Sequence, residues 1–239
     1  MTVLVTGATG ATGKWLTKHL LDRGHHVRAV VRSPEKLLSI TGNAPNLTLI
    51  QASILDLTDQ EMAEHVRDCD AVASCLGHTL SFKGVYGPPR RLVTEAARRL
   101  CQAAMANQPA SPVKFVLMNT TGNRNRDLHE PISLAQRAVI ALLRLTLPPH
   151  VDNEQAAEYL RTHIGQDHRV IEWVAVRPDG LTDADVVSAY TTHPSPTRSA
   201  IFDAGKVSRI NVAHFMADLI TDEAIWRKWK GQMPVIYNG

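Results

Sequence analysis

Two patterns of apolar residues alternate along the chain. Short β-branched and apolar runs, which are typical of buried strands, lie at residues 3–5, 27–31, 47–51, 71–76, 113–118 and 171–177. Apolar residues recur at helical spacing at residues 15–21, 59–66, 90–106, 132–147, 153–163 and 210–220. This alternation is typical of a doubly wound parallel sheet with helices on both faces, so we predict an α/β fold.

A single domain is expected for residues 1–239. Folds of this class and length commonly form one unit, and the sequence contains no internal repeat and no linker. Clusters of prolines interrupt the apolar patterns and are interpreted as loop corners. These clusters lie at residues 88–89, 109–112, 148–149 and 194–196.

The first strand runs directly into a turn with glycines at a G-x-x-G-x-x-G spacing. Gly7 permits a tight turn, Gly10 lets backbone N–H groups approach an anion, and Gly13 lets the next helix pack closely on the sheet. The positive end of that helix faces the same place. A purely structural turn is the alternative, but the strand before it and the helix after it favour a binding site for a dinucleotide pyrophosphate.

The residue after the second strand indicates which dinucleotide binds. Sites selective for NAD usually carry an acidic residue there, which accepts hydrogen bonds from the ribose hydroxyls. This chain has Arg32, with Ser33 beside it and Lys36 one helical turn later. A guanidinium would hold a 2′-phosphate that an acid would repel, so NADP(H) is the predicted cofactor. The alternative is that Arg32 is an ordinary surface residue at the end of a strand.

Polar residues and glycines follow the remaining strands, where ligands of such sheets bind. Ser53 or Asp56 is expected near an adenine, Gly77 near a ribose, and the hydroxyl of Thr120 or Thr121 near a nicotinamide. Ordinary structural roles are the alternatives. Asp56 would cap the next turn, the side chains at residues 119–121 would satisfy backbone groups, and His78 would be a solvated loop residue.

Composition argues against nucleic-acid-binding, secreted and membrane-spanning proteins. The formal net charge is +3 and no long basic run occurs, so nucleic-acid binding is not expected. Cys69, Cys75 and Cys101 are widely spaced and are interpreted as inert core thiols. No secretory signal and no apolar run of membrane-spanning length stands out, so a cytoplasmic protein without a membrane segment is expected. We predict no metal site.

Several motifs together resemble the atypical short-chain dehydrogenase/reductases. They are TGATGATG at residues 6–13, Arg32, CLG at 75–77, NTT at 119–121, RPDGL at 177–181 and SRINVAHFM at 208–216. The pattern is similar to the biliverdin-IXβ reductase/flavin reductase-like and NmrA-like branch. The resemblance implies a Rossmann fold that binds NADP through the turn and Arg32, with adenine, ribose and nicotinamide contacts beyond it. The implied binding residues are Gly7, Ala8, Thr9, Gly10, Ala11, Thr12, Gly13, Arg32, Ser53, Ile54, Leu76, Gly77, Thr120, Thr121 and Pro178.

The chain departs from the wider superfamily at the proton relay. Catalytic members use a Tyr-x-x-x-Lys pair, in which lysine lowers the tyrosine pKa. Alignment puts His150 and Glu154 at those places, and Tyr159 is followed four residues later by His163. Asn119 or Thr120 stands where a serine is common. Reduction of an ordinary carbonyl is therefore not expected.

Hydride transfer to a flavin, quinone or tetrapyrrole remains, because such acceptors can take their proton from water. Thr120 and Thr121 are the catalytic candidates, and residues 122–150 and 179–209 are expected to be substrate-side insertions. The alternative is a catalytically silent NADPH sensor that acts through a protein partner. A sugar-nucleotide epimerase or dehydratase is disfavoured by the same missing pair.

The helix expected at residues 132–147 is unusually apolar. It could roof an apolar pocket, or it could be an ordinary core helix or the surface of a homodimer. Arg137 and Arg144 are its only cations, so a shallow membrane contact is disfavoured.

Overall fold

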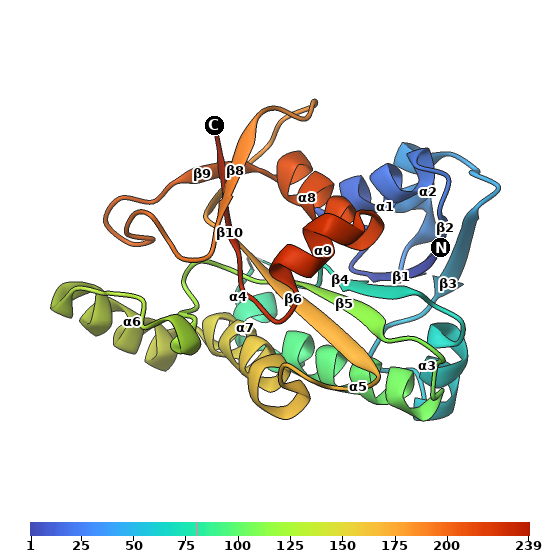
Figure 1. Cartoon of the computed structure of the whole chain (residues 1–239), viewed down its shortest axis with the longest axis horizontal. Coiled ribbons are helices and arrows are strands. Elements are labelled where there is room, and N and C mark those ends of the chain that lie inside the picture. The colour runs from blue at the N-terminus through green and yellow to red at the C-terminus, as the bar shows by residue number, and fades with distance from the viewer. Residues whose placement is uncertain (80) are drawn as a thin grey trace.

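An eight-stranded sheet of order β3-β2-β1-β4-β5-β6-β10-β8 forms the centre of the molecule (Figure 1). The computed structural model describes residues 1–79 and 81–239. Neighbouring strands are parallel except for β10 and β8, which are antiparallel. The strands of this sheet are β1 (Thr2–Thr6), β2 (His26–Val31), β3 (Leu47–Gln51), β4 (Ala71–Ser74), β5 (Val113–Met118), β6 (Ile171–Pro178), β8 (Tyr190–His193) and β10 (Val235–Asn238). A separate parallel pair consists of β7 (Gly180–Thr182) and β9 (Lys206–Ser208).

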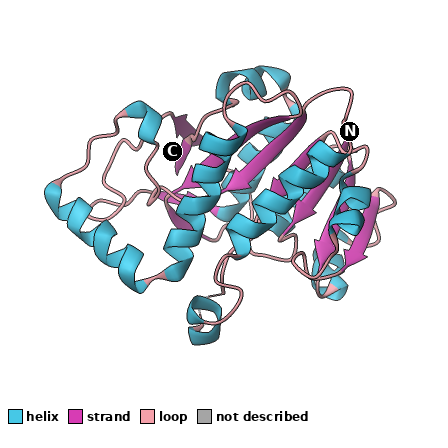
Figure 2. Cartoon of the chain, turned by 90° about the horizontal axis from the view of Figure 1, so that it is seen from below, coloured by secondary structure: helices cyan, strands magenta, loops and turns pink. Residues whose placement is uncertain are grey.

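Helices cover both faces of the sheet. On one face lie α1 (Gly13–Asp22), α2 (Pro34–Thr41), α8 (Arg209–Thr221) and α9 (Glu223–Trp229) (Figure 1). On the other lie α3 (Asp59–Val66), α5 (Leu92–Ala106) and α7 (Pro148–Tyr159), which Figure 2 shows from below. The remaining elements are α4 (Phe82–Tyr86), α6 (Leu134–Thr146), a 3-10 turn at Arg126–Leu128 and a π turn at Leu160–Ile164.

Alternate side chains of each central strand pack into two separate cores. In β1, Val3 and Val5 join the core beneath α1 and α8, while Leu4 joins the core beneath α3 and α5. In β5, Phe115 and Val116 divide in the same way. Parallel strands buried on both faces read as continuous apolar runs, which is the pattern the sequence shows. The predicted doubly wound α/β fold is confirmed.

Three elements have the expected bounds, most others differ by one or two residues at an end, and one helix begins five residues before its expected start. The expected bounds of β3, α3 and β5 are those observed. The interpretation of Pro148 and Pro149 as a loop corner is wrong, because α7 begins at Pro148 rather than at residue 153. Proline has no N–H and a helical φ, so the first turn of a helix accepts it.

Helix α6 extends away from the sheet at one end of the molecule (Figure 1). Ile140 is its one buried residue, whereas Leu134, Leu142 and Leu145 are exposed. The alternative of an ordinary core helix is therefore wrong. One side of α6 instead lines the cavity described below, and its outer side presents leucines to solvent.

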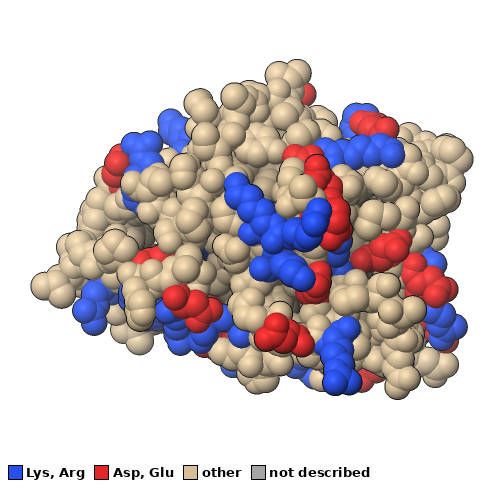
Figure 3. Space-filling view, in the orientation of Figure 1, with Lys and Arg blue, Asp and Glu red and all other residues tan. Residues whose placement is uncertain are grey.

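Basic and acidic side chains are interspersed on the face seen in Figure 3, where a basic group over α9 lies beside acidic residues. No helix in residues 1–79 and 81–239 is long and apolar enough to cross a membrane. Among the same residues, no group of three or more potential ligands is arranged to hold a metal ion. Burial raises the pKa of Cys69 to about 11 and that of Cys75 to about 12, and it also raises that of Cys101. These values support their interpretation as inert thiols.

Candidate functional site

Two glycines of the turn after β1 have no room for a side chain. Gly7 has a φ of +72°, and a Cβ there would lie 2.5 Å from the carbonyl oxygen of Cys75. A Cβ on Gly13 would lie 2.1 Å from the carbonyl oxygen of Gly7. The turn therefore fits against the end of β4, and α1 approaches the turn closely, as the motif predicts.

Three backbone N–H groups around the start of α1 are left without an acceptor in the described chain. They are the N–H groups of Ala11, Thr12 and Gly13. Thr12 precedes the helix but makes no side-chain cap. Ala11 is exposed. Open donors at the positive end of a helix bind a diphosphate, so these residues fit the pyrophosphate of a dinucleotide.

Arg32 lies at the same edge of the sheet as the glycine turn. Thr6 pairs with Val30, which places the residues after β1 and β2 at one level. The Arg32 side chain is exposed and pairs with no acidic group among the described residues. It is therefore available for a ligand phosphate.

The segment after β3 tests whether Asp56 caps the turn that follows it. Thr58, rather than Asp56, caps the start of α3, and Thr58 forms a capping box with Glu61. The interpretation of Asp56 as the cap is wrong. Ile54 belongs to the hydrophobic core, so it would offer an adenine mainly its backbone, whereas Ser53 is only partly buried.

The segment after β4 combines an open position with a buried pair. A Cβ on Gly77 would meet no described atom within 4 Å, which leaves room for the expected ribose. His78 is not a solvated loop residue, because its side chain is only 5% exposed and its Nε2 lies 2.8 Å from Asp152 Oδ2. Asp152 also accepts hydrogen bonds from two N–H groups at the start of α5. This buried pair ties the end of β4 to α5 and α7.

Asn119, directly after β5, has a structural role. Its side-chain nitrogen donates to the carbonyl oxygen of Asn153 at 2.9 Å. Its side-chain oxygen accepts from the N–H of Thr120 and from the amide of Asn123. Asn119 therefore satisfies polar groups at the strand end, as the structural alternative expects.

The two threonines after β5 differ in their surroundings. The Thr121 hydroxyl donates to Asp179 at 3.1 Å and is buried, and its N–H donates to the carbonyl oxygen of Pro178 at 3.0 Å. Thr121 thus joins the ends of β5 and β6. Thr120 is less buried, and its hydroxyl oxygen accepts from the N–H of Gly122 at 3.3 Å. Thr120 is the better placed of the two to reach a ligand.

The residues at the positions of the usual proton relay are not arranged as a tyrosine–lysine pair. Burial raises the pKa of Tyr159 to about 12, and its ring stacks on His163 with 5.2 Å between centroids. His150 is buried, and its Nε2 lies 3.5 Å from Glu154 Oε1. Neither Tyr159 nor His150 lines the cavity described next.

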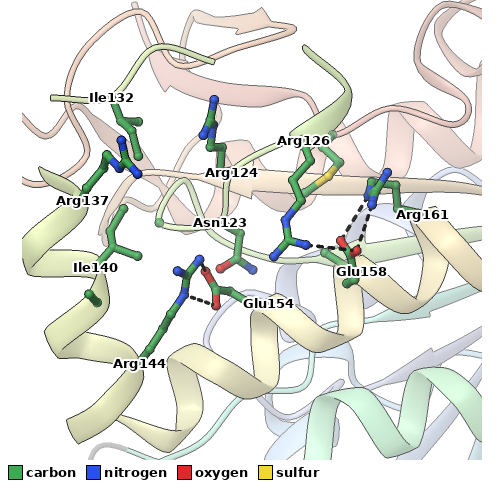
Figure 4. A pocket seen from close by; sticks show the side chains of 14 residues that line it. Asn123, Arg124, Arg126, Ile132, Arg137, Ile140, Arg144, Glu154, Glu158 and Arg161 are labelled. Carbon is green, nitrogen blue, oxygen red and sulfur yellow. Dashed lines mark hydrogen bonds and ion pairs between the residues drawn. The ribbon is translucent and has the colours of Figure 1, made fainter. Parts of the chain in front are cut away.

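A cavity of about 430 Å³ lies beyond β5, between α6, α7 and the segment after β5 (Figure 4). One alternative from the sequence is that the helix at residues 132–147 roofs a pocket, and α6 does line this cavity. The expected pocket is apolar, however, and its charged lining was not predicted, although the alternating arginines after the NTT motif at residues 119–121 were a signal. Its lining residues are Gly122, Asn123, Arg124, Arg126, Ile132, Arg137, Ile140, Ala141, Arg144, Glu154, Ala157, Glu158, Arg161 and Met233.

Glu154 is held as a carboxylate at the edge of this cavity. Arg144 donates to both of its oxygens at 2.8 Å, and His150 lies on its other side. Burial tends to raise the pKa of Glu154, but the His150 ring and the Arg144 guanidinium together lower it to about 2. The pair joins α6 to α7 and closes one side of the cavity.

Glu154→Gln is expected to destabilise the protein by roughly 2–3 kcal/mol at neutral pH, because a folded-state pKa below the usual value stabilises the fold. The stabilisation is complete above about pH 4.5, the ordinary pKa of this group, and is lost as the pH falls towards about 2. Urea unfolding at several pH values measures it. Asp185→Asn, at an exposed position without an ion pair in the described chain, is the control and should show little difference. A gap for Glu154→Gln that stays constant down to about pH 2 would contradict the assignment.

Comparison with known proteins identifies the family. A family model described as NAD(P)H-binding matches residues 7–223, which includes the glycine turn and every strand end described above. The prediction that the chain binds a nicotinamide dinucleotide is thereby confirmed.

Named relatives extend the comparison. The chain is 40% identical to cinnamoyl-CoA reductase 1 of Petunia hybrida over 134 residues, which are 52% of this chain and 38% of that enzyme. The chain thus spans about two-fifths of that relative's length. Among solved structures, the oxidoreductase ylbE of Lactococcus lactis has a TM-score of 0.69 at 20% identity, covering 100% of this chain and 91% of the other. ChuY, an anaerobillin reductase of Escherichia coli O157:H7, has a TM-score of 0.68 at 17% identity, covering 100% and 97%. These structures share the fold.

Proposed function

This chain belongs to the NAD(P)H-binding family, and we propose that it is a reductase that transfers a hydride from NADPH to an aromatic acceptor, such as a flavin, a quinone or a tetrapyrrole. When bound, NADPH supplies the hydride from its nicotinamide ring. The glycine turn and Arg32 hold the pyrophosphate and the 2′-phosphate, while Gly77 leaves space for the ribose. Thr120 and Pro178 position the nicotinamide.

The observation that carries the proposal is that the cavity adjoins the end of β5, where the nicotinamide is expected. Gly122 and Asn123 line it, and they directly follow Thr120 and Thr121 at the end of β5. A ligand in the cavity would therefore lie next to the expected nicotinamide position. Proximity and orientation are the main requirements of hydride transfer, and this arrangement supports the first of them.

The proton is expected to come from water. Tyr86, Tyr159 and Tyr190 are followed four residues later by arginine, histidine and proline, not by lysine. The pKa of Tyr159 is raised by burial, whereas a relay tyrosine needs a lowered one. A delocalised ring stabilises the negative charge that the hydride brings, so no positioned acid is required.

Tyr159→Phe and His150→Ala are each expected to change turnover less than about 3-fold, since neither side chain reaches the cavity. Thr120→Ala should slow turnover modestly by loosening the nicotinamide. The measurement is NADPH oxidation with a panel of flavins, quinones and linear tetrapyrroles. Loss of a general acid costs about 100-fold or more, so a loss of that size in Tyr159→Phe would restore a proton relay.

An NADPH sensor is the second candidate. The exposed Leu134, Leu142 and Leu145 on α6 favour it, because leucines facing solvent suit contact with another protein. Tight NADPH binding without turnover across the whole acceptor panel would support the sensor and contradict the reductase.

A further inference from the structure

The cavity beyond β5 carries more positive than negative charge. Five arginines and two glutamates line it. Arg144 pairs with Glu154. Glu158 pairs with the two arginines Arg126 and Arg161. These pairs leave Arg124 and Arg137, which form no ion pair within residues 1–79 and 81–239 and have no dashed contact in Figure 4.

The backbone on both sides of Arg124 is fixed by a buried ion pair. Arg177, which is fully buried, donates to the carbonyl oxygen of Asn123 at 2.8 Å and to both oxygens of Glu130. Glu130 in turn accepts from the N–H of Asn125 at 2.8 Å. The backbone that carries Arg124 is therefore held in place, so binding has to order only the arginine side chain.

Arg137 approaches the cavity from the opposite wall, on α6. Figure 4 shows its side chain between Ile132 and Ile140, facing the segment that carries Arg124. Ser133 caps the start of this helix by accepting from the N–H of Gln136 at 3.1 Å. The same wall therefore combines apolar surface, on which a ring can lie, with an uncompensated cation.

We propose that this cavity selects acceptors that carry a carboxylate or phosphate group, which Arg124 and Arg137 bind. The proposal rests on the proposed reductase function and names its substrate class: aromatic acceptors with an anionic side group. A planar guanidinium binds either anion through two parallel hydrogen bonds. The ring then lies towards Gly122, next to the expected nicotinamide position, and the anion lies farther out.

Riboflavin and flavin mononucleotide test this directly, because they share one ring and differ by a phosphate. We expect kcat/KM for flavin mononucleotide to exceed that for riboflavin by about 10-fold or more, the usual effect of one charge-assisted contact. Arg124→Gln and Arg137→Gln should each reduce the preference several-fold, because they lower kcat/KM for flavin mononucleotide more than kcat/KM for riboflavin. Arg126→Gln is the matched control, because Arg126 is already paired with Glu158.

A naphthoquinone with and without a carboxylate side chain forms a second pair, which separates carboxylate from phosphate recognition. A preference in either pair that depends on both arginines supports the proposal. Equal kcat/KM within both pairs, with turnover present, would overturn the proposal and leave the reductase function standing.

Absence of turnover would instead refute the reductase, and binding then decides the proposal by itself. Quenching of flavin fluorescence measures the affinity of the NADP⁺-loaded protein for both flavins. Tighter binding of flavin mononucleotide that is lost in Arg124→Gln and Arg137→Gln would support an anion-selective cavity. Equal affinities, or no binding of either flavin, would overturn it.

Discussion

Gly10→Val is expected to weaken NADPH binding at least ~100-fold while the protein remains folded. Gly10 stands between the turn and the open N–H groups of α1, where the pyrophosphate is expected. A valine side chain would occupy that space and cost at least two charge-assisted hydrogen bonds, each worth roughly 1.5 kcal/mol or more. A Cβ at Gly10 would lie 3.0 Å from the Gly7 carbonyl oxygen, which must shift by a few tenths of an ångström to admit it.

Calorimetry with NADPH gives the affinity, and thermal unfolding without cofactor reports the fold. Ala110→Val is the control, because it adds the same kind of side chain to an exposed loop before β5, at the opposite edge of the sheet. Its affinity should equal that of the unmodified protein. Unmodified affinity in Gly10→Val would mean that the glycine turn is not the phosphate site.

The fold was predictable because its central strands are buried on both faces. Continuous apolar runs such as residues 113–118 leave little choice of structure, and turn residues mark their ends. The C-terminal strand β10 was not predicted. It is short, follows a proline, and is a strand only because β6 and the antiparallel β8 lie on either side of it.

The cofactor-binding residues could be predicted from the sequence, whereas the lining of the cavity could not. The cofactor residues follow strand ends, and parallel strands bring all those ends to one edge of the sheet. The cavity depends instead on where α6 leaves the body of the protein. Helical periodicity shows that α6 has an apolar side but does not show which neighbour covers it. The pairing of Arg144 with Glu154, which closes one side of the cavity, joins residues on two different helices.

Arg32→Asp, at the end of β2, is expected to reverse the preference of the protein for NADPH over NADH. The unmodified protein should bind NADPH more tightly than NADH, because Arg32 is exposed, unpaired in the described structure and level with the phosphate turn. A charged contact to phosphate is worth roughly 1.5–3 kcal/mol, or about 10-fold to 150-fold in affinity. Aspartate removes that contact, repels the 2′-phosphate and accepts hydrogen bonds from the free ribose hydroxyls of NADH. The preference should therefore reverse.

Separate dissociation constants for NADPH and NADH, measured on both proteins, test the reversal. Arg169→Asp makes the same change of charge on an exposed residue just before β6, at the opposite edge of the sheet. It should leave the preference intact, which separates a local contact from the effect of net charge. A reversal in Arg32→Asp alone assigns Arg32 to the 2′-phosphate. Equal affinities of the unmodified protein for both cofactors would refute that assignment, because an arginine in contact with the 2′-phosphate would make NADPH bind more tightly than NADH.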